Sequence, residues 1–395
     1  LNLSFSLFFG VIQMDVQQYL ERMKVIHEQL LKYIENDQNS NENYQNLIKI
    51  LDDQKIRENK YELKSLLNII SRISNHHRRI PDFLTKIDQL IQHFKSDITN
   101  YFTNYEIFSI FKENKRAILL LIESQLLTID KSIANTIKNN KFFKVDYPLY
   151  FFPEMKPFLS RELSQEKENE DPDIKRLQEF SKNVPADFEE KRKIGENDNK
   201  LCQLIRSDSL KEFIDYIEEN KLLIQATTMV EPSLFETNLF LIKNKKITLI
   251  EYAAFYGSIQ IFKMLSENKK LRQKVMFSAI HSENMELIQL IEDKNADKEI
   301  MKKVLKETIK CHHNNLTNYF IENFFKDDAD ISAVISMLAL KYYNFAFLKN
   351  EIVNESIFYD LCCNDYYPIV EFILKNGNVD INKIVIQKVA LFYSI

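Results

Sequence analysis

Glycine is scarce in this chain: only four of its 395 residues are glycine, at positions 10, 195, 257 and 377. The closest pair, Gly195 and Gly257, lies 62 positions apart. A phosphate-binding loop, a dinucleotide-binding fingerprint and the nucleotide lid of a kinase each need two or three glycines within about eight positions. The sequence therefore excludes these nucleotide-binding motifs, and we expect no cofactor.

Cysteine is scarce too. The four cysteines are Cys202, Cys311, Cys362 and Cys363, and no two of them form a CxxC pair. The neighbouring Cys362 and Cys363 have a poor geometry for a disulfide or for zinc ligation, so we expect no metal site. So few cysteines in a long chain are typical of a reducing compartment, and we expect a cytoplasmic protein.

Positive charge is not in excess. The 53 basic and 57 acidic residues give a net charge of -4, and lysine far outnumbers arginine. Nucleic-acid-binding proteins usually carry a basic stripe with many arginines, so we expect no nucleic acid partner. The short basic cluster at 76–79 is better explained as a helix end, where positive charge is favourable. Electrostatic binding of nucleic acid or of an anionic membrane remains an alternative, and it predicts binding that weakens steeply with salt.

Long apolar runs are absent as well. The most apolar internal run, 117–129, is interrupted by three polar residues and is shorter than the roughly 20 residues that span a bilayer, so we expect no membrane partner. Residues 1–13 (LNLSFSLFFGVIQ) are apolar but contain no basic residue. We interpret them as an extension upstream of Met14, with a signal peptide as the alternative.

Apolar residues are nevertheless plentiful. They make up 45% of the chain, which is ordinary for a globular protein, and the length predicts two or three domains. From 14 to 146 they recur at steps of three and four, which predicts an N-terminal domain of antiparallel helices. The clearest stripe consists of Val16, Tyr19, Leu20, Met23, Ile26, Leu30 and Ile34.

Two unusual segments follow between 147 and 186. The first, YPLYFFPEMKPFL at 147–159, contains three prolines and several aromatic residues, which predicts an extended arm lying on a neighbouring domain. A polyproline ligand is the alternative for this segment. The second, at 161–173, is acidic and poor in apolar residues, which predicts a linker at the domain boundary.

A repeat begins near residue 201 and continues to the end of the chain. Each unit predicts a short helix, a tight turn and a second helix whose apolar positions are three and four apart. The clearest copies lie at 248–265, 279–291, 339–347 and 361–382, with an indistinct copy around 309–321. The apolar segment at 383–395 follows the last copy. Because repeat arrays normally end in a polar cap, we expect either further sequence or another chain to cover this segment.

The sequences TLIEYAAFYG (248–257) and KNGNVDIN (375–382) resemble the ankyrin repeat. Thr248 would cap the first helix, and Gly257 would take the left-handed conformation that ends it. Leu249 and Glu251 depart from the usual proline and histidine, and few copies keep a glycine at the turn. The stretches DFEEKRKIGENDN (187–199), CQLIRSD (202–208) and SLFETN (233–238) are similar to a large ankyrin-repeat family that is expanded in protists.

This resemblance implies an all-α chain in which an ankyrin-like helical solenoid occupies 187–395. It also implies a non-enzymatic adaptor or scaffold that binds another protein through the concave face of the solenoid. In such solenoids the partner contacts the ends of the first helices. Here those positions are Phe255, Tyr256, His281, Ser282, Lys341, Tyr342 and Asn364. The alternative for the two aromatic residues at 255 and 256 is internal packing under the arm at 147–159.

The run Cys311-His312-His313 is the most enzyme-like cluster in the sequence. A cysteine–histidine dyad needs the two side chains to meet and a third group to orient the imidazole. Neighbours on one helix point about 100° apart, so this run alone does not provide a dyad. We expect no enzyme and no catalytic residues. A cysteine-dependent hydrolase that uses Cys311 or Cys202 is the alternative from a different class, and it predicts a selectively reactive thiol.

Overall fold

The computed structural model describes residues 16–375, 384–385 and 388–389, except 37, 78–79, 81, 140–145, 161–162, 164–171, 245, 267–272, 293–296, 329 and 349–354. The interpretations of 1–13, of most of the acidic segment at 161–173, and of most of 375–382 and 383–395 concern residues outside this set.

The prediction of an all-α chain is confirmed for the described residues. They form helices joined by turns, together with one antiparallel pair of two-residue strands, β1 (Ile384–Val385) and β2 (Lys388–Val389). The chain divides into two compact units, 1–70 with 317–395, and 71–316. These units do not follow the predicted division between 146 and 187, because both ends of the chain belong to the first unit.

The first unit contains the N-terminal helices and the last helices of the chain. Its elements are α1 (Val16–Glu35), α2 (Ser40–Asp53), η1 (Ile56–Glu58), the first part of α3 (Lys60–His76), the end of α22 (Asn314–Phe324), α23 (Ile331–Tyr342), η3 (Phe345–Phe347), α24 (Glu355–Cys363), α25 (Tyr367–Lys375), β1 and β2.

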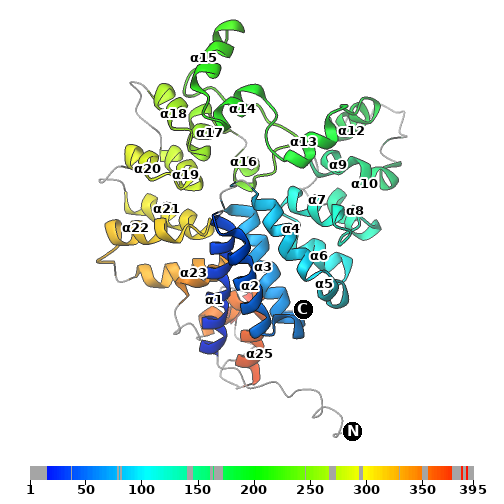
Figure 1. Cartoon of the computed structure of the whole chain (residues 1–395), viewed down its shortest axis with the longest axis vertical. Coiled ribbons are helices and arrows are strands. Elements are labelled where there is room, and N and C mark those ends of the chain that lie inside the picture. Colours follow the sequence, from blue (N-terminus) through cyan, green and yellow to red (C-terminus); the bar gives the residue numbers. More distant parts are fainter. Residues whose placement is uncertain are drawn as a thin grey trace. The chain divides into compact units, whose positions relative to one another are not determined.

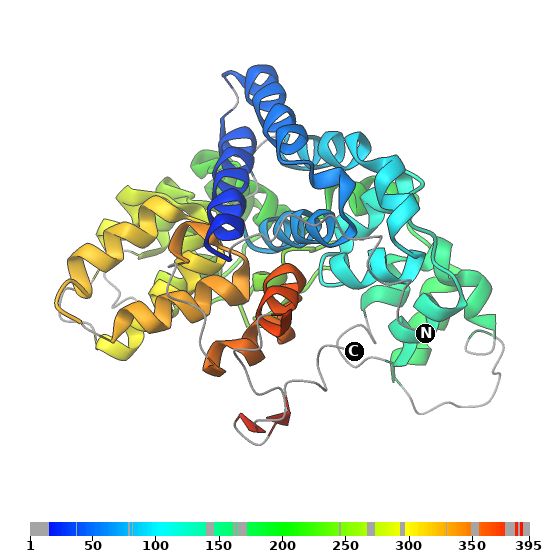
Figure 2. The same cartoon turned by 90° about the horizontal axis from the view of Figure 1, so that it is seen from below.

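Helix α1 packs against α2, η3 and α25, so residues from both ends of the chain form one core (Figure 2). All seven residues of the predicted stripe on α1 are buried, which confirms the helical face inferred from their spacing. Polar contacts join α3 to the C-terminal helices. Lys64 pairs with Asp365 at 3.0 Å, and the ring of Tyr61 stacks on that of Tyr367.

The second unit contains the end of α3 and all helices up to the start of α22. Its elements are α4 (Phe83–His93), α5 (Lys95–Tyr101), α6 (Asn104–Phe111), α7 (Lys115–Glu123), α8 (Lys131–Asn139), α9 (Asp146–Tyr150), α10 (Phe152–Met155), η2 (Lys156–Phe158), α12 (Pro172–Lys182), α13 (Phe188–Ile194), α14 (Lys200–Arg206), α15 (Leu210–Glu219), α16 (Leu239–Lys243), α17 (Leu249–Tyr256), α18 (Ile259–Ser266), α19 (Gln273–Ser282), α20 (Met285–Ile291) and α21 (Lys298–Lys310).

The expected extended arm at 147–159 is wrong, because this segment is helical in α9, α10 and η2. Its prolines lie at the starts of these short helices, where a missing N–H removes no helical hydrogen bond. Four of its five aromatic residues are buried: Tyr147, Tyr150, Phe151 and Phe152. Tyr150 donates a hydrogen bond to the carbonyl oxygen of Arg192, and the Arg192 guanidinium pairs with Glu154 at 2.7 Å.

Several consecutive helices of the described chain form pairs that are joined by a recurring turn. In the second unit α17 packs on α18 and on α19, and α19 in turn packs on α20 and α21 (Figure 1). A residue in the left-handed conformation follows the first helix of each pair and lets the chain reverse. In most pairs, the N–H of the residue after it donates to the carbonyl oxygen five positions earlier in the chain, as in a Schellman motif. These left-handed residues are Asp208, Gly257, Glu283, His312, Tyr343 and Asp365. The turn therefore recurs although only one of the six is glycine.

Among the described residues, no helix combines the length and the apolar character needed to cross a bilayer.

Candidate functional site

A pocket of about 720 Å³ lies in the second unit, between α16, α17, α19, α21 and the end of α3. Leu239, Phe240, Ile247 and Phe277 give it an apolar part, and His76 at the end of α3 closes one side. Four lysines line the same pocket from three segments that are far apart in the sequence. They are Lys243, Lys246, Lys274 and Lys310.

The pocket also contains two glutamates, and both carboxylates are already bonded. Glu251 accepts hydrogen bonds from the backbone N–H and the hydroxyl of Thr248 at 2.8 and 3.0 Å. Glu307 accepts from His281 at 3.0 Å and from Lys310 at 2.5 Å. Lys246 and Lys274 are exposed and make no ion pair with the described residues. Lys310 pairs with Glu307, and Lys243 lies 3.8 Å from Glu113. The positive charge that the pocket offers to a ligand is therefore that of Lys246 and Lys274.

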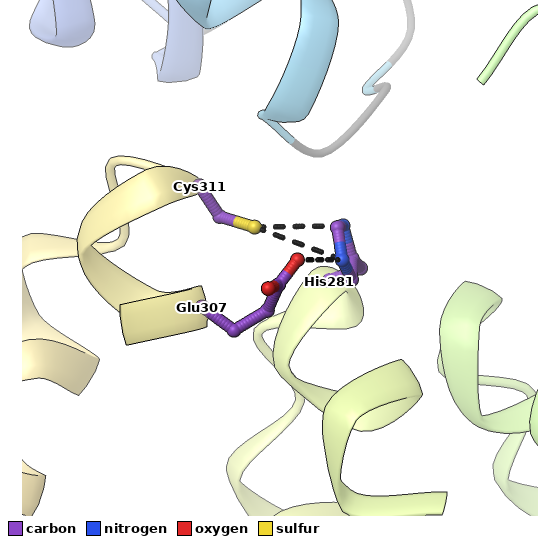
Figure 3. A group of neighbouring side chains, drawn as sticks. All are labelled: His281, Glu307 and Cys311. Atoms are coloured by element: carbon purple, nitrogen blue, oxygen red, sulfur yellow. Dashed lines mark hydrogen bonds and ion pairs between the residues drawn. The ribbon is translucent and has the colours of Figure 1, made fainter. Parts of the chain in front are cut away.

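A buried cluster of three side chains adjoins this pocket. His281 lies at the end of α19, whereas Glu307 and Cys311 lie four residues apart at the end of α21 and so share one face of that helix (Figure 3). Cys311 Sγ lies 3.5 Å from His281 Nδ1, and His281 Nε2 lies 3.0 Å from Glu307 Oε1. Glu307 belongs to both the cluster and the lining of the pocket.

The electrostatics of the cluster define its hydrogen-bond directions. Burial lowers the pKa of His281, so the imidazole is neutral near pH 7. Burial opposes ionisation of Glu307, but hydrogen bonding and attraction from His281 and Lys310 outweigh it and lower the pKa of Glu307 to about 2. Because an ionised carboxylate only accepts, His281 donates from Nε2 and leaves Nδ1 to accept from the Cys311 thiol.

This order of cysteine, histidine and glutamate is that of a nucleophile, a base and an orienting acid. The Cys311 side chain is fully buried, however, and burial followed by repulsion from Glu307 raises its pKa well above the ordinary value. Burial also raises the pKa of the Cys202 thiol to about 12. An activated nucleophile shows the opposite shift, so neither thiol has the features expected of a hydrolase nucleophile.

Further histidines surround the cluster. His77 Nδ1 lies 2.9 Å from the carbonyl oxygen of Cys311, and the His77 ring lies 4.9 Å from that of His313. His76 is also buried. Burial, followed by repulsion from Lys310 and His281, lowers its pKa well below the ordinary value. The part of the second unit around Cys311 therefore brings several histidines together.

The predicted partner-binding residues do not form one exposed surface in the described chain. In the second unit, Phe255, His281 and Ser282 are buried, and Tyr256 is half-buried. The Phe255 ring packs on Phe240 and on His281 rather than under the segment at 147–159. In the first unit Tyr342 is buried, Asn364 is half-buried and Lys341 is exposed. Few of the predicted partner-binding side chains are therefore exposed, because the large ones pack on neighbouring helices.

Sequence reasoning missed the pocket lysines and the meeting of His281 with Cys311. The imidazole that lies beside the Cys311 thiol belongs to His281 at the end of α19. The spacing of the predicted repeat is the sequence signal that could have predicted the contact between His281 and Cys311. Consecutive first helices pack side by side, so their ends meet although they are about 30 residues apart.

No protein-family model matches this chain, and no curated protein or solved structure matches it either.

Proposed function

We propose that this chain is a non-enzymatic adaptor that binds another protein, and that an acidic segment of the partner occupies the lysine-lined pocket. The observation that carries the proposal is the unbalanced charge of the pocket. Four lysines line it against two glutamates, and the two exposed lysines, Lys246 and Lys274, make no ion pair with the described residues.

The composition of the pocket suits a peptide that is both acidic and partly apolar. Phe240 and Phe277 are half-buried in the pocket and offer aromatic surface to one inserted side chain. Lys246 and Lys274 are exposed at the same pocket, where they can pair with carboxylates on either side of that anchor. Charge complementarity of this kind favours the correct partner and speeds its association.

Two further observations agree with an adaptor in a reducing compartment. The sequences at 248–257 and 375–382 resemble the ankyrin repeat, whose members bind proteins, and α17 with α18 and α19 with α20 are adjoining helix pairs. All four cysteines are free thiols, which supports a cytoplasmic location. The cysteine hydrolase is the weaker candidate, because burial raises the pKa of both thiols in question.

Fluorescence anisotropy with a synthetic peptide tests the proposal. The probe is a labelled, glutamate-rich peptide with one central phenylalanine, compared with a lysine-rich peptide of the same length. We expect the wild-type chain to bind only the acidic peptide. The double variant Lys246→Glu, Lys274→Glu should bind it at least about tenfold more weakly, which corresponds to about 1.4 kcal/mol.

A matched control changes the same amount of charge elsewhere in the same unit. Lys200 and Lys211 are exposed in the first turns of α14 and α15, where glutamate is compatible with the helix. The variant Lys200→Glu, Lys211→Glu should therefore bind the acidic peptide like the wild type. Equal weakening in both double variants, or binding that inorganic phosphate displaces as well as the peptide does, would contradict a peptide-specific pocket.

A further inference from the structure

We infer that His281, Glu307 and Cys311 form a binding site for one divalent transition-metal ion, with zinc the best match. The three side chains come from the ends of α19 and α21, which pack on each other, and converge on one point (Figure 3). Their candidate ligand atoms, one from each residue, all lie within 4.8 Å of one another. This inference does not require the proposed binding of an acidic partner, although Glu307 and Lys310 also line that pocket.

The donor set is typical of zinc. Zinc accepts imidazole nitrogen, thiolate sulfur and carboxylate oxygen at about 2.0 to 2.3 Å and prefers tetrahedral geometry. Those bond lengths place a nitrogen and a sulfur ligand about 3.6 Å apart, and a nitrogen and an oxygen ligand about 3.3 Å apart. In the cluster, His281 Nε2 lies 3.8 Å from Cys311 Sγ and 3.0 Å from Glu307 Oε1. Both separations differ from the tetrahedral values by a few tenths of an ångström. The Cys311 sulfur and the Glu307 oxygen lie within 4.8 Å of each other, against about 3.6 Å in a tetrahedral site, so a side-chain movement of about 1 Å brings all three ligands into place.

The protein holds the imidazole in place without any ion. The His281 ring lies 4.2 Å from the centroid of Phe240 and 4.9 Å from that of Phe255, and aromatic contacts on this scale restrict its rotation. A ligand whose orientation is set by packing loses little freedom when a metal binds. The i, i+4 spacing of Glu307 and Cys311 on α21 likewise fixes where the oxygen and the sulfur lie.

One cation competes for this site. The Lys310 ammonium lies 2.5 Å from Glu307 Oε1 and must give up that contact, or share the carboxylate, when a metal binds. Lys310 lines the pocket, so its flexible side chain can turn toward solvent. Glu307 lines the pocket as well, so an ion can reach the cluster from the pocket.

A bound ion would link α19 directly to α21, and so one helix pair to the next. Because His281, Glu307 and Cys311 converge only in the folded chain, metal binding stabilises that state. At a free metal concentration 100 times the dissociation constant, the unfolding equilibrium constant falls about 100-fold.

Cobalt(II) tests the site spectroscopically, since it replaces zinc and reports on its ligands. We expect the full-length wild-type chain to bind one Co²⁺, with a thiolate-to-cobalt charge-transfer band and intense visible bands of tetrahedral geometry. Zinc should displace the cobalt and abolish these bands. Cys311→Ala should abolish the charge-transfer band. Glu307→Gln should weaken cobalt binding at least about 100-fold, because loss of a residue that only supports a ligand weakens metal binding by up to about 100-fold and Glu307 is a ligand itself.

The controls separate this site from adventitious binding at other cysteines. Cys202→Ala and Cys363→Ala remove a buried and an exposed thiol and should leave the cobalt spectrum unchanged. Circular dichroism establishes that each variant is folded. Should Cys311→Ala not fold, Glu307→Gln decides, because glutamine keeps the size of the side chain while removing its charge. The absence of a charge-transfer band in the wild type, or a band that persists in Cys311→Ala and disappears in Cys363→Ala, would overturn the inference.

Discussion

His27 lies fully buried on α1, near the ring of Phe345 in the first unit. Burial disfavours its charged form and lowers its pKa to about 3. The histidines and cysteines of the second unit follow the same rule, since burial is the largest cause of shift for His76, His281, Cys202 and Cys311. At the scale of single residues, withdrawal from water therefore sets the protonation of these groups.

The stability of the first unit should consequently decrease in weak acid. The folded-state pKa of His27 lies below the unfolded value near 6.5, so the unfolded chain takes up a proton first as the pH falls. The stability contributed by neutral His27 is complete above pH 6.5 and is lost between about pH 6.5 and 3. Between pH 7 and pH 5, the free energy of unfolding of the wild type should therefore fall by about 2 kcal/mol more than that of His27→Gln. Urea titrations at both pH values measure this difference, and parallel pH profiles of the two proteins would contradict it.

Thiol reactivity should follow exposure. Cys363 is exposed, whereas Cys202, Cys311 and Cys362 are buried. A maleimide reagent at neutral pH should therefore label Cys363 rapidly and the other three only after denaturation, as read by peptide mass spectrometry. Rapid labelling of Cys311 in the folded chain would instead favour the cysteine hydrolase.

At the scale of elements, the sequence predicts local structure well where local chemistry decides it. Thr248 and Glu251 form a complete capping box at the start of α17, and Gly257 ends that helix with φ at 71°. Predictions failed where tertiary packing decides. The segment at 147–159 is helical because most of its aromatic residues are buried in the second unit, and its prolines fall where short helices begin. The turns without glycine were harder to recognise, because Asp208, Glu283 and similar residues seldom adopt a left-handed conformation.

The cap of α17 should be measurable. Thr248 is buried, and its hydroxyl accepts from the Glu251 N–H while Glu251 accepts from the Thr248 N–H. Thr248→Ala should lower the free energy of unfolding by about 1 kcal/mol, whereas Thr248→Ser, which keeps the hydroxyl, should lower it much less. Thermal unfolding compares the two, and equal losses would show that methyl packing rather than capping is responsible.

At the scale of the whole molecule, contacts between distant parts of the chain were not predictable from periodicity. Periodicity shows which face of a helix is buried but not which helix covers it, so the pairing of α1 with η3 and α25 came only from the structure. The site was hidden for the same reason. Its lysines lie on α16, α19 and α21 and in the loop after α16, and each alone resembles an ordinary surface lysine. The sequence-based expectation of no metal site considered cysteine pairs and not the meeting of His281, Glu307 and Cys311.

Zero-length cross-linking is the most direct test of the central claim that the lysine-lined pocket receives an acidic segment. A carbodiimide joins carboxylates of the bound glutamate-rich peptide to lysine amines in contact with them, and peptide mass spectrometry identifies the lysines. We predict cross-links concentrated on Lys243, Lys246 and Lys274, and their loss when excess unlabelled peptide competes. Cross-links spread evenly over the exposed lysines, or concentrated on Lys200 and Lys211, would contradict the account.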